Sequence, residues 1–205
     1  MINMKRAVSV MVLAICCHTE AGLGQDVAAP VMPNVDLETE EGKKMAAYEE
    51  AVDRHCCIGL LCSYIILEEM EERGGPAMYE ALLRSVQTPE WMKSLDACPA
   101  DYRAMHLKII KKSKDLLDRI GKEKMDEGQL MEAYGKLGKE CMELGAGVME
   151  KYQLYKYGKK FFKMTALQMG GNKEERLKNL YRMKEELISG KMKLPVKDSG
   201  MEDEI

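Results

Sequence analysis

The stretch LMEAYGKLGKECMELGAGVMEKYQLY, residues 130–155, carries the clearest periodic pattern in the sequence. Its apolar positions follow one another at steps of three and four residues: Leu130, Tyr134, Leu137, Cys141, Leu144, Val148, Tyr152 and Tyr155. This spacing is close to the 3.5-residue repeat of helices that pack lengthwise against one another, as in a coiled coil. The preceding DEGQ at 126–129 has the spacing of a capping box, with Asp126 in the place of Ser or Thr. The stretch therefore predicts a long amphipathic helix that begins next to Asp126 and packs in a bundle.

Four glycines interrupt this pattern: Gly135, Gly138, Gly145 and Gly147. Each glycine inside a helix costs up to about 1 kcal/mol relative to alanine. Two interpretations of them stay open. The glycines let a neighbouring backbone approach closely, or the helix is kinked near Gly145.

Helical patterns extend over most of the chain from Asp36 onwards. Good helix formers such as Met, Leu, Lys, Glu and Ala dominate, and no useful length of sequence alternates with the period of two of a strand. Further helices are expected over residues 36–73 and 77–86, from Pro89 after the N-cap Thr88, from near Pro99 to Ile120, and over 173–188. Short turns that carry glycine or proline, such as Gly74-Gly75-Pro76, separate them. We therefore predict an all-α fold, an antiparallel helical bundle of three long and two or three shorter helices over residues 36–190.

Apolar stripes predict which side of three of these helices faces the core. The positions expected to point inward are Tyr48, Ala51, His55, Ile58, Cys62 and Ile65 in the first long helix, His106, Ile110, Leu117 and Ile120 in the second, and Leu177, Leu180, Tyr181, Met183 and Leu187 in the last. The eighteen methionines are scattered among such positions, so we interpret them as core packing rather than as a copper-binding array.

The N-terminal residues have the layout of a secretory signal peptide. A basic start at 5–6 is followed by an uncharged run over 7–17 and then by small residues that allow cleavage at a point between Ala21 and Gly24. The run is shorter than the roughly 20 apolar residues that a spanning helix needs. We therefore expect residues 1–24 to be a signal peptide and the protein to be exported, into the periplasm or out of the cell.

A lipoprotein signal with Cys16 as the lipidated residue is the alternative, and the bulky Ile15 in front of that cysteine disfavours it. Residues 25–35 carry two prolines and no periodicity and are expected to form a flexible lead-in, and residues 191–205 a disordered tail. No segment of the expected mature chain is apolar enough to span a membrane. Its slightly acidic charge indicates no general attraction to nucleic acid.

Five cysteines would remain after signal cleavage: Cys56, Cys57, Cys62, Cys98 and Cys141. Exported chains meet oxidising conditions, so disulfides are expected. The preferred pairing joins Cys98 to Cys56 or Cys57, and Cys141 to Cys62, although sequence alone cannot fix connectivity. The alternative is that these residues are buried thiols that act as small hydrophobes.

A metal or haem site is the other use to which these residue types point. The candidate ligands are His55, His106, Cys62 and Cys141. His55 and Cys62 share a helix face but lie about 10 Å apart along the axis, and zinc binds its ligands at about 2.0–2.3 Å. Donors would have to come from different helices. We therefore expect no resident cofactor and interpret both histidines first as core residues.

No recognisable catalytic motif is present: the sequence lacks Gly-x-Ser-x-Gly, His-Glu-x-x-His and Walker-type patterns. The segment 151–164 mixes five lysines with aromatic residues, which we interpret as a helix with an aromatic core side and a charged water side. The sequence favours an exported, non-enzymatic helical bundle that binds a protein or an envelope component. The alternative is an exported bundle that binds metal or haem through His, Cys and Met donors.

Overall fold

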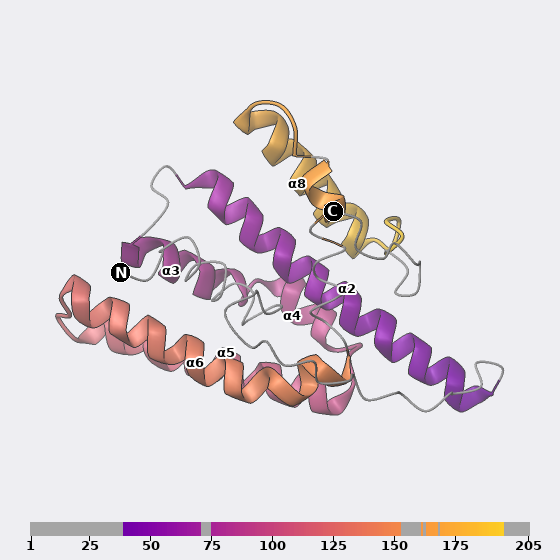
Figure 1. Ribbon diagram of the computed structural model, residues 1–205, viewed down its shortest axis with the longest axis horizontal. Helices are drawn as coiled ribbons and strands as arrows, with labels where there is room; N and C mark the ends of the chain where they lie inside the picture. Colours follow the sequence, from indigo (N-terminus) through magenta and orange to yellow (C-terminus); the bar gives the residue numbers. More distant parts are fainter. Residues whose placement is uncertain (1–38, 71–74, 153–160, 162, 168, 195–205) are drawn as a thin grey trace, which may run out of the picture.

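The computed structural model describes residues 39–70, 75–152, 161, 163–167 and 169–194, and within these ranges the protein is helical without strands. The helices are α2 (Glu40–Glu69), α3 (Gly75–Ser85), α4 (Pro89–Leu95), α5 (Ala100–Lys122), α6 (Glu127–Lys151) and α8 (Lys173–Ile188). The predicted all-α class is confirmed, and α2, α5 and α6 are the three long helices that the periodicity indicates (Figure 1).

The expected signal peptide at 1–24, with Cys16, lies outside the described residues, as do the lead-in at 25–35 and all but the first four residues of the expected tail. Among the described helices, none combines the length and the apolar character that a membrane crossing requires.

Local capping explains where several helices begin. The Asp126 carboxylate accepts a hydrogen bond from the backbone N–H of Gln129, and the backbone N–H of Asp126 donates one to the Gln129 side-chain oxygen in return, which is the predicted capping box of α6. Asn172 and Glu175 form the same reciprocal pair at α8. Thr88 caps α4 directly before Pro89, as the sequence indicates.

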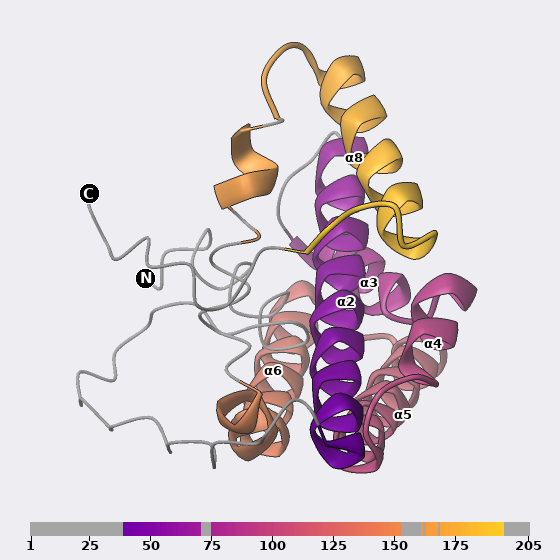
Figure 2. The same ribbon diagram turned by 90° about the vertical axis from the view of Figure 1, so that its right-hand side faces the viewer.

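The long helix α2 lies in the middle of the molecule (Figure 2). One side contacts α8, and other sides contact α3 and α4. The helix α8 runs antiparallel to α2, because Arg54 in the middle of α2 donates to the carbonyl of Leu187 near the end of α8 at 2.8 Å, while Arg176 near the start of α8 pairs with Glu68 near the end of α2 at 2.9 Å. The Arg54 contact satisfies a carbonyl in the last turn of α8.

The helices α5 and α6 form an antiparallel hairpin on another side of the molecule (Figure 1). Its open end is held where Asp101 of α5 accepts hydrogen bonds from Lys151 at 2.6 Å and from the Tyr152 hydroxyl at 3.0 Å. Midway along, Lys112 and Glu140 form an ion pair of 2.5 Å. The hairpin therefore keeps one register along its length.

Two of the four glycines that interrupt the pattern of α6 face open space and do not allow a neighbouring backbone to approach closely. An added Cβ atom would meet no atom within 4 Å at Gly135 or at Gly147, so the close-approach interpretation is wrong at these two positions. The helix continues without a break through Gly145. Periodic burial along α6 outweighs the low helix propensity of its glycines.

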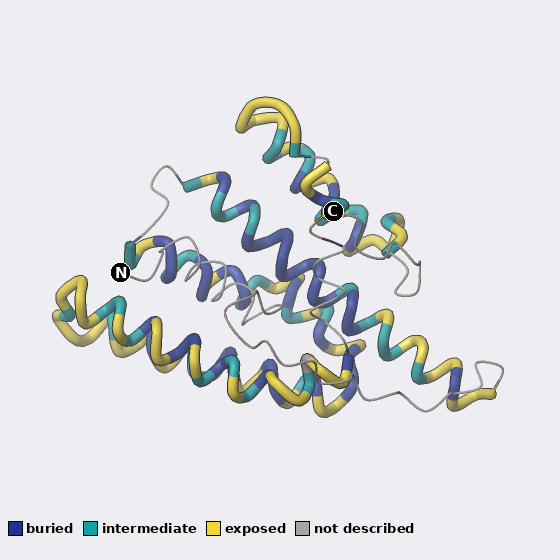
Figure 3. Tube along the Cα trace, in the orientation of Figure 1, coloured by how far each residue is buried: buried dark blue, intermediate teal, exposed yellow. Residues whose placement is uncertain are grey.

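The core lies between the facing sides of these helices (Figure 3). Its largest fully buried side chains are Trp91, Tyr102, Tyr134, Phe161, Ile58, Leu60, Leu61, Met78, Leu82, Leu83 and Leu95. Each such side chain contributes about 1.5–3 kcal/mol through burial. The prediction that Tyr181 points into the core is wrong, because this side chain is 40% exposed. Its hydroxyl donates to Glu69 at the surface of the contact between α2 and α8.

Candidate functional site

Four aromatic side chains from three helices meet in the core. We call them the ring cluster: His55 from α2, Trp91 from α4, and Tyr102 and His106 from α5. The ring of His55 lies 4.3 Å from that of Trp91 and 4.9 Å from that of His106, measured between centroids. None of the four is more than 2% exposed. Both predicted inward histidines are thus buried, and the fold brings them together across two helices.

A short hydrogen-bond chain fixes the tautomer of His55. The Ser94 hydroxyl donates its proton to the Trp91 carbonyl at 2.7 Å. The same oxygen lies 2.8 Å from His55 Nδ1. Since a hydroxyl has only one proton to donate, Nδ1 must be the donor in this contact. His55 therefore carries its proton on Nδ1, and Nε2 keeps a bare lone pair in the core.

Three polar atoms of the ring cluster have no hydrogen-bond partner among the described residues: His55 Nε2, His106 Nδ1 and Trp91 Nε1. Their rings instead contact one another, and Trp91 and His106 meet at 5.3 Å in an edge-to-face arrangement. Aromatic pairs in such arrangements contribute about 0.5–1.5 kcal/mol beyond burial. The cluster is thus held by ring packing and by one hydrogen-bond chain.

Burial keeps both imidazoles neutral. Removal from water lowers the pKa of His106 from 6.5 to about 3. Removal from water, together with the neighbouring His106, holds the pKa of His55 well below 6.5. A general acid or base works best with a pKa near the working pH and within reach of substrate. Neither histidine meets those conditions.

The four candidate metal ligands do not assemble into one site. Cys62 lies near Thr88 and Lys184, and Cys141 lies near Lys112 on the hairpin. Only His55 and His106 come together, and the described part of the chain holds no group of three His, Cys, Asp or Glu side chains that could bind a metal ion. A bis-histidine haem does not fit, because the two imidazoles contact each other directly and leave no space for a porphyrin between them.

The expected disulfides are absent from the described residues, where Cys56, Cys57, Cys62, Cys98 and Cys141 are all buried thiols. The Cys98 thiol lies within hydrogen-bond reach of two backbone carbonyls, Ala51 at 3.5 Å and Ser94 at 3.6 Å. Burial raises the pKa of Cys98 to about 12 and that of Cys141 to about 11. The preferred pairings are therefore corrected in favour of the alternative, in which these cysteines act as small core residues. The predicted pairing of Cys141 with Cys62 is wrong because the two thiols have different neighbours in the fold.

Sequence reasoning placed both histidines but missed their partners. Trp91, Ser94 and Tyr102 were not recognised as neighbours of His55. One signal was available: Trp91 is the single tryptophan of the chain and sits in the first turn after the Thr88 cap. A large ring on a short, well-capped helix indicates an anchor for a core.

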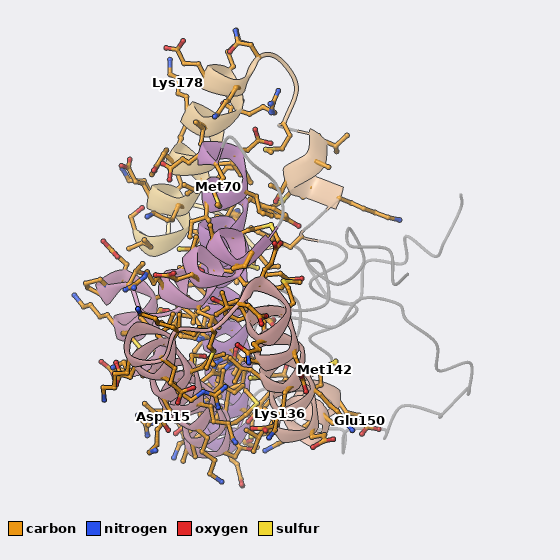
Figure 4. All side chains as sticks on the ribbon, turned by 90° about the vertical axis from the view of Figure 1, so that its left-hand side faces the viewer. Met70, Asp115, Lys136, Met142, Glu150 and Lys178 are labelled. Carbon is orange, nitrogen blue, oxygen red and sulfur yellow. The ribbon has the colours of Figure 1, made fainter. Side chains whose placement is uncertain are left out.

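The second candidate lies on the surface of the hairpin. We call it the hairpin groove, an open hollow of about 280 Å³ lined by Lys112, Asp115, Leu116 and Arg119 of α5 and by Ala133, Lys136, Leu137 and Glu140 of α6. Figure 4 shows Asp115 and Lys136 in the part of the molecule that lies away from Lys178 of α8. Leu116 and Leu137 are largely buried and form its floor.

The ion pair between Lys112 and Glu140 in the hairpin groove stays charged. The hydrogen bond between Lys112 and Glu140 raises the pKa of the lysine and lowers that of the glutamate. Asp115 pairs with Lys111 at 2.8 Å. Lys136 takes part in none of the ion pairs between described residues. The groove therefore presents fixed charges of both signs, with an excess of positive charge, to a molecule that enters it.

Comparison with protein-family models, with curated proteins and with solved structures finds no match.

Proposed function

We propose that the protein is an exported, non-enzymatic interaction module, and that it binds a protein or an envelope component through the hairpin groove. Export rests on the signal-peptide layout of residues 1–24. The proposed absence of catalysis is supported by the state of the residues best suited to it, since the described histidines and cysteines are buried, burial lowers the pKa of both histidines, and burial raises the pKa of Cys98 and Cys141.

One observation carries the binding role. The hairpin groove combines an apolar floor with charged side chains that stay exposed to water. Recognition surfaces are built in this way, with an apolar centre that excludes water and a polar rim that selects the partner. The ring cluster has neither an opening nor a charged rim.

Site-directed photo-crosslinking tests this proposal. A photo-reactive amino acid replaces Lys136 in one variant of the full chain and Lys178 of α8 in a matched control, and each is exposed to the envelope and secreted fractions of the source cells. We expect one defined crosslinked product from position 136 that is lost when Arg119→Glu is added. Equal labelling from the two positions, or no product from position 136, would refute the proposal.

A second candidate function is the binding of a single Cu(I) ion by His55 and His106. It is favoured by the contact of two neutral imidazoles, one of which presents a bare nitrogen while its other nitrogen donates to Ser94, as metal-bound histidines usually do. Two donors do not satisfy zinc, which takes four ligands. Anaerobic titration of the full chain against a chromophoric Cu(I) chelator decides the matter. Stoichiometric Cu(I) that is lost in both His55→Phe and His106→Phe supports the candidate, and no competition with the chelator eliminates it.

A further inference from the structure

The charge on α5 indicates which kind of partner the hairpin groove accepts, an inference that rests on the proposed function. Four basic side chains and one acidic side chain follow one another at steps of three and four residues along one stripe of α5: Lys108, Lys111, Asp115, Arg119 and Lys122. All five are exposed. Such spacing places them on a single side of the helix, the side that borders the groove through Asp115 and Arg119.

Part of this positive charge is not neutralised within the described chain. Two of the acidic groups next to the stripe are engaged, Asp115 with Lys111 and Glu140 with Lys112, while Asp118 takes part in none of the ion pairs between described residues. Lys108, Lys122 and, across the groove, Lys136 take part in none of the ion pairs between described residues. Arg119 approaches Glu123 only at 3.6 Å. A complementary partner therefore carries negative charge on both sides of the groove.

The shape of the groove limits the partner further. A hollow of about 280 Å³ is slightly smaller than the roughly 300–1,000 Å³ of pockets that enclose small ligands, and this one is open. The channel between two antiparallel helices instead suits a third helix, which inserts apolar side chains spaced three and four residues apart. Here they would lie over Leu116, Ala133 and Leu137.

We propose that the occupant of the hairpin groove is an acidic amphipathic helix of a partner protein. Its apolar side chains pack on Leu116 and Leu137, and its carboxylates lie between the α5 stripe and Lys136. A membrane surface fits less well. Helices that lie in a bilayer interface insert large apolar side chains, and none of the exposed large apolar residues among those described, Leu107, Leu167, Tyr181 and Ile188, lines the groove.

Fluorescence anisotropy with two defined peptides tests this inference on the full chain. One labelled peptide is a helix of glutamate and leucine, and the other has lysine at every glutamate position. We expect binding of the acidic peptide only. The double variant Arg119→Glu with Lys136→Glu should weaken it about tenfold, whereas Lys178→Glu on α8 should leave it unchanged. Because the contact is electrostatic, raising the salt concentration should also weaken binding.

Three outcomes overturn the inference: equal binding of both peptides, an equal effect of the groove and control variants, and sedimentation with vesicles of equal parts phosphatidylcholine and phosphatidylglycerol in the absence of peptide binding. Circular dichroism confirms that each variant is folded. Failure here is distinct from failure of the proposed function. A crosslinked product from position 136 without acidic-peptide binding keeps the interaction module and removes the acidic helix.

Discussion

The ring cluster and the hairpin groove both use residues of α5, and the two sides of this helix differ in their exposure to water. The inner side supplies Tyr102 and His106, whose surroundings exclude water. The outer side supplies Lys112 and Arg119, which stay in contact with water. Burial holds His106 neutral, and exposure together with an ion pair holds Lys112 charged. The two histidines are therefore core residues, and lysines and arginines line the exposed surface through which we propose that the protein binds its partner.

The largest expected loss of stability comes from removing the Trp91 ring that packs against the inner side of α5. Trp91→Ala deletes a fully buried ring that contacts both histidines, and we expect the free energy of unfolding to fall by about 3–5 kcal/mol. Urea unfolding followed by circular dichroism measures it, with Lys178→Ala as an exposed control expected to change stability by no more than about 0.5 kcal/mol. A loss below about 1 kcal/mol for Trp91→Ala would show that the cluster is not the centre of packing.

Acid should destabilise the inner side before it affects the outer one. In the unfolded chain His106 has a pKa of 6.5, whereas in the folded chain it is about 3. Its contribution to stability is therefore complete above pH 6.5 and is lost as the pH falls toward 3, at up to about 1.4 kcal/mol per pH unit. Urea unfolding at a series of pH values measures this slope. His106→Phe keeps a ring in place and should make the slope shallower; an unchanged slope would contradict the assignment.

The ion pair between Arg176 and Glu68 is more buried than the pair between Lys112 and Glu140. Arg176 donates to Glu68, which is only 11% exposed in its side chain, and so ties α8 to α2. Arg176→Met removes charged hydrogen bonds and should cost about 2 kcal/mol. Lys112→Met breaks the exposed pair on the outer side and should leave the unfolding midpoint unchanged. Equal losses in the two variants would mean that burial does not set the strength of these pairs.

The smallest expected effect concerns a glycine near the groove. Gly135→Ala fills open space on an exposed turn of α6 and should raise the free energy of unfolding by up to about 1 kcal/mol. The matched variant Gly75→Ala changes a residue with φ of +71°, where a side chain is strained, and should lower stability. Thermal unfolding followed by circular dichroism compares them. A destabilising Gly135→Ala would indicate that a close contact exists there after all.

Periodicity and capping made much of the fold predictable. The steps of three and four residues along α6 and the Asp126 box needed only local information, and both agree with the structure. The burial of His55 and His106 followed from the same stripes. Capping and apolar spacing depend on residues within a single helix, so the sequence alone is enough to predict them.

Contacts between helices were harder to predict. The disulfide pairings were wrong because shared inward direction does not give shared neighbours, as Cys62 and Cys141 illustrate. The hairpin groove was not found at all, since its residues look like an ordinary charged surface until α5 and α6 are set in register. Tyr181 was misplaced because a hydroxyl can satisfy an edge position that periodicity assigns to the core.

The central claim is that His55 and His106 are neutral core residues in the folded chain. An NMR titration of their ring protons in the native protein tests it most directly, with assignments from His55→Phe and His106→Phe. The account predicts that neither resonance moves between about pH 8 and pH 5, since the pKa of His106 is about 3 and that of His55 is well below 6.5. A titration midpoint near 6.5 for either histidine while the protein remains folded would contradict it.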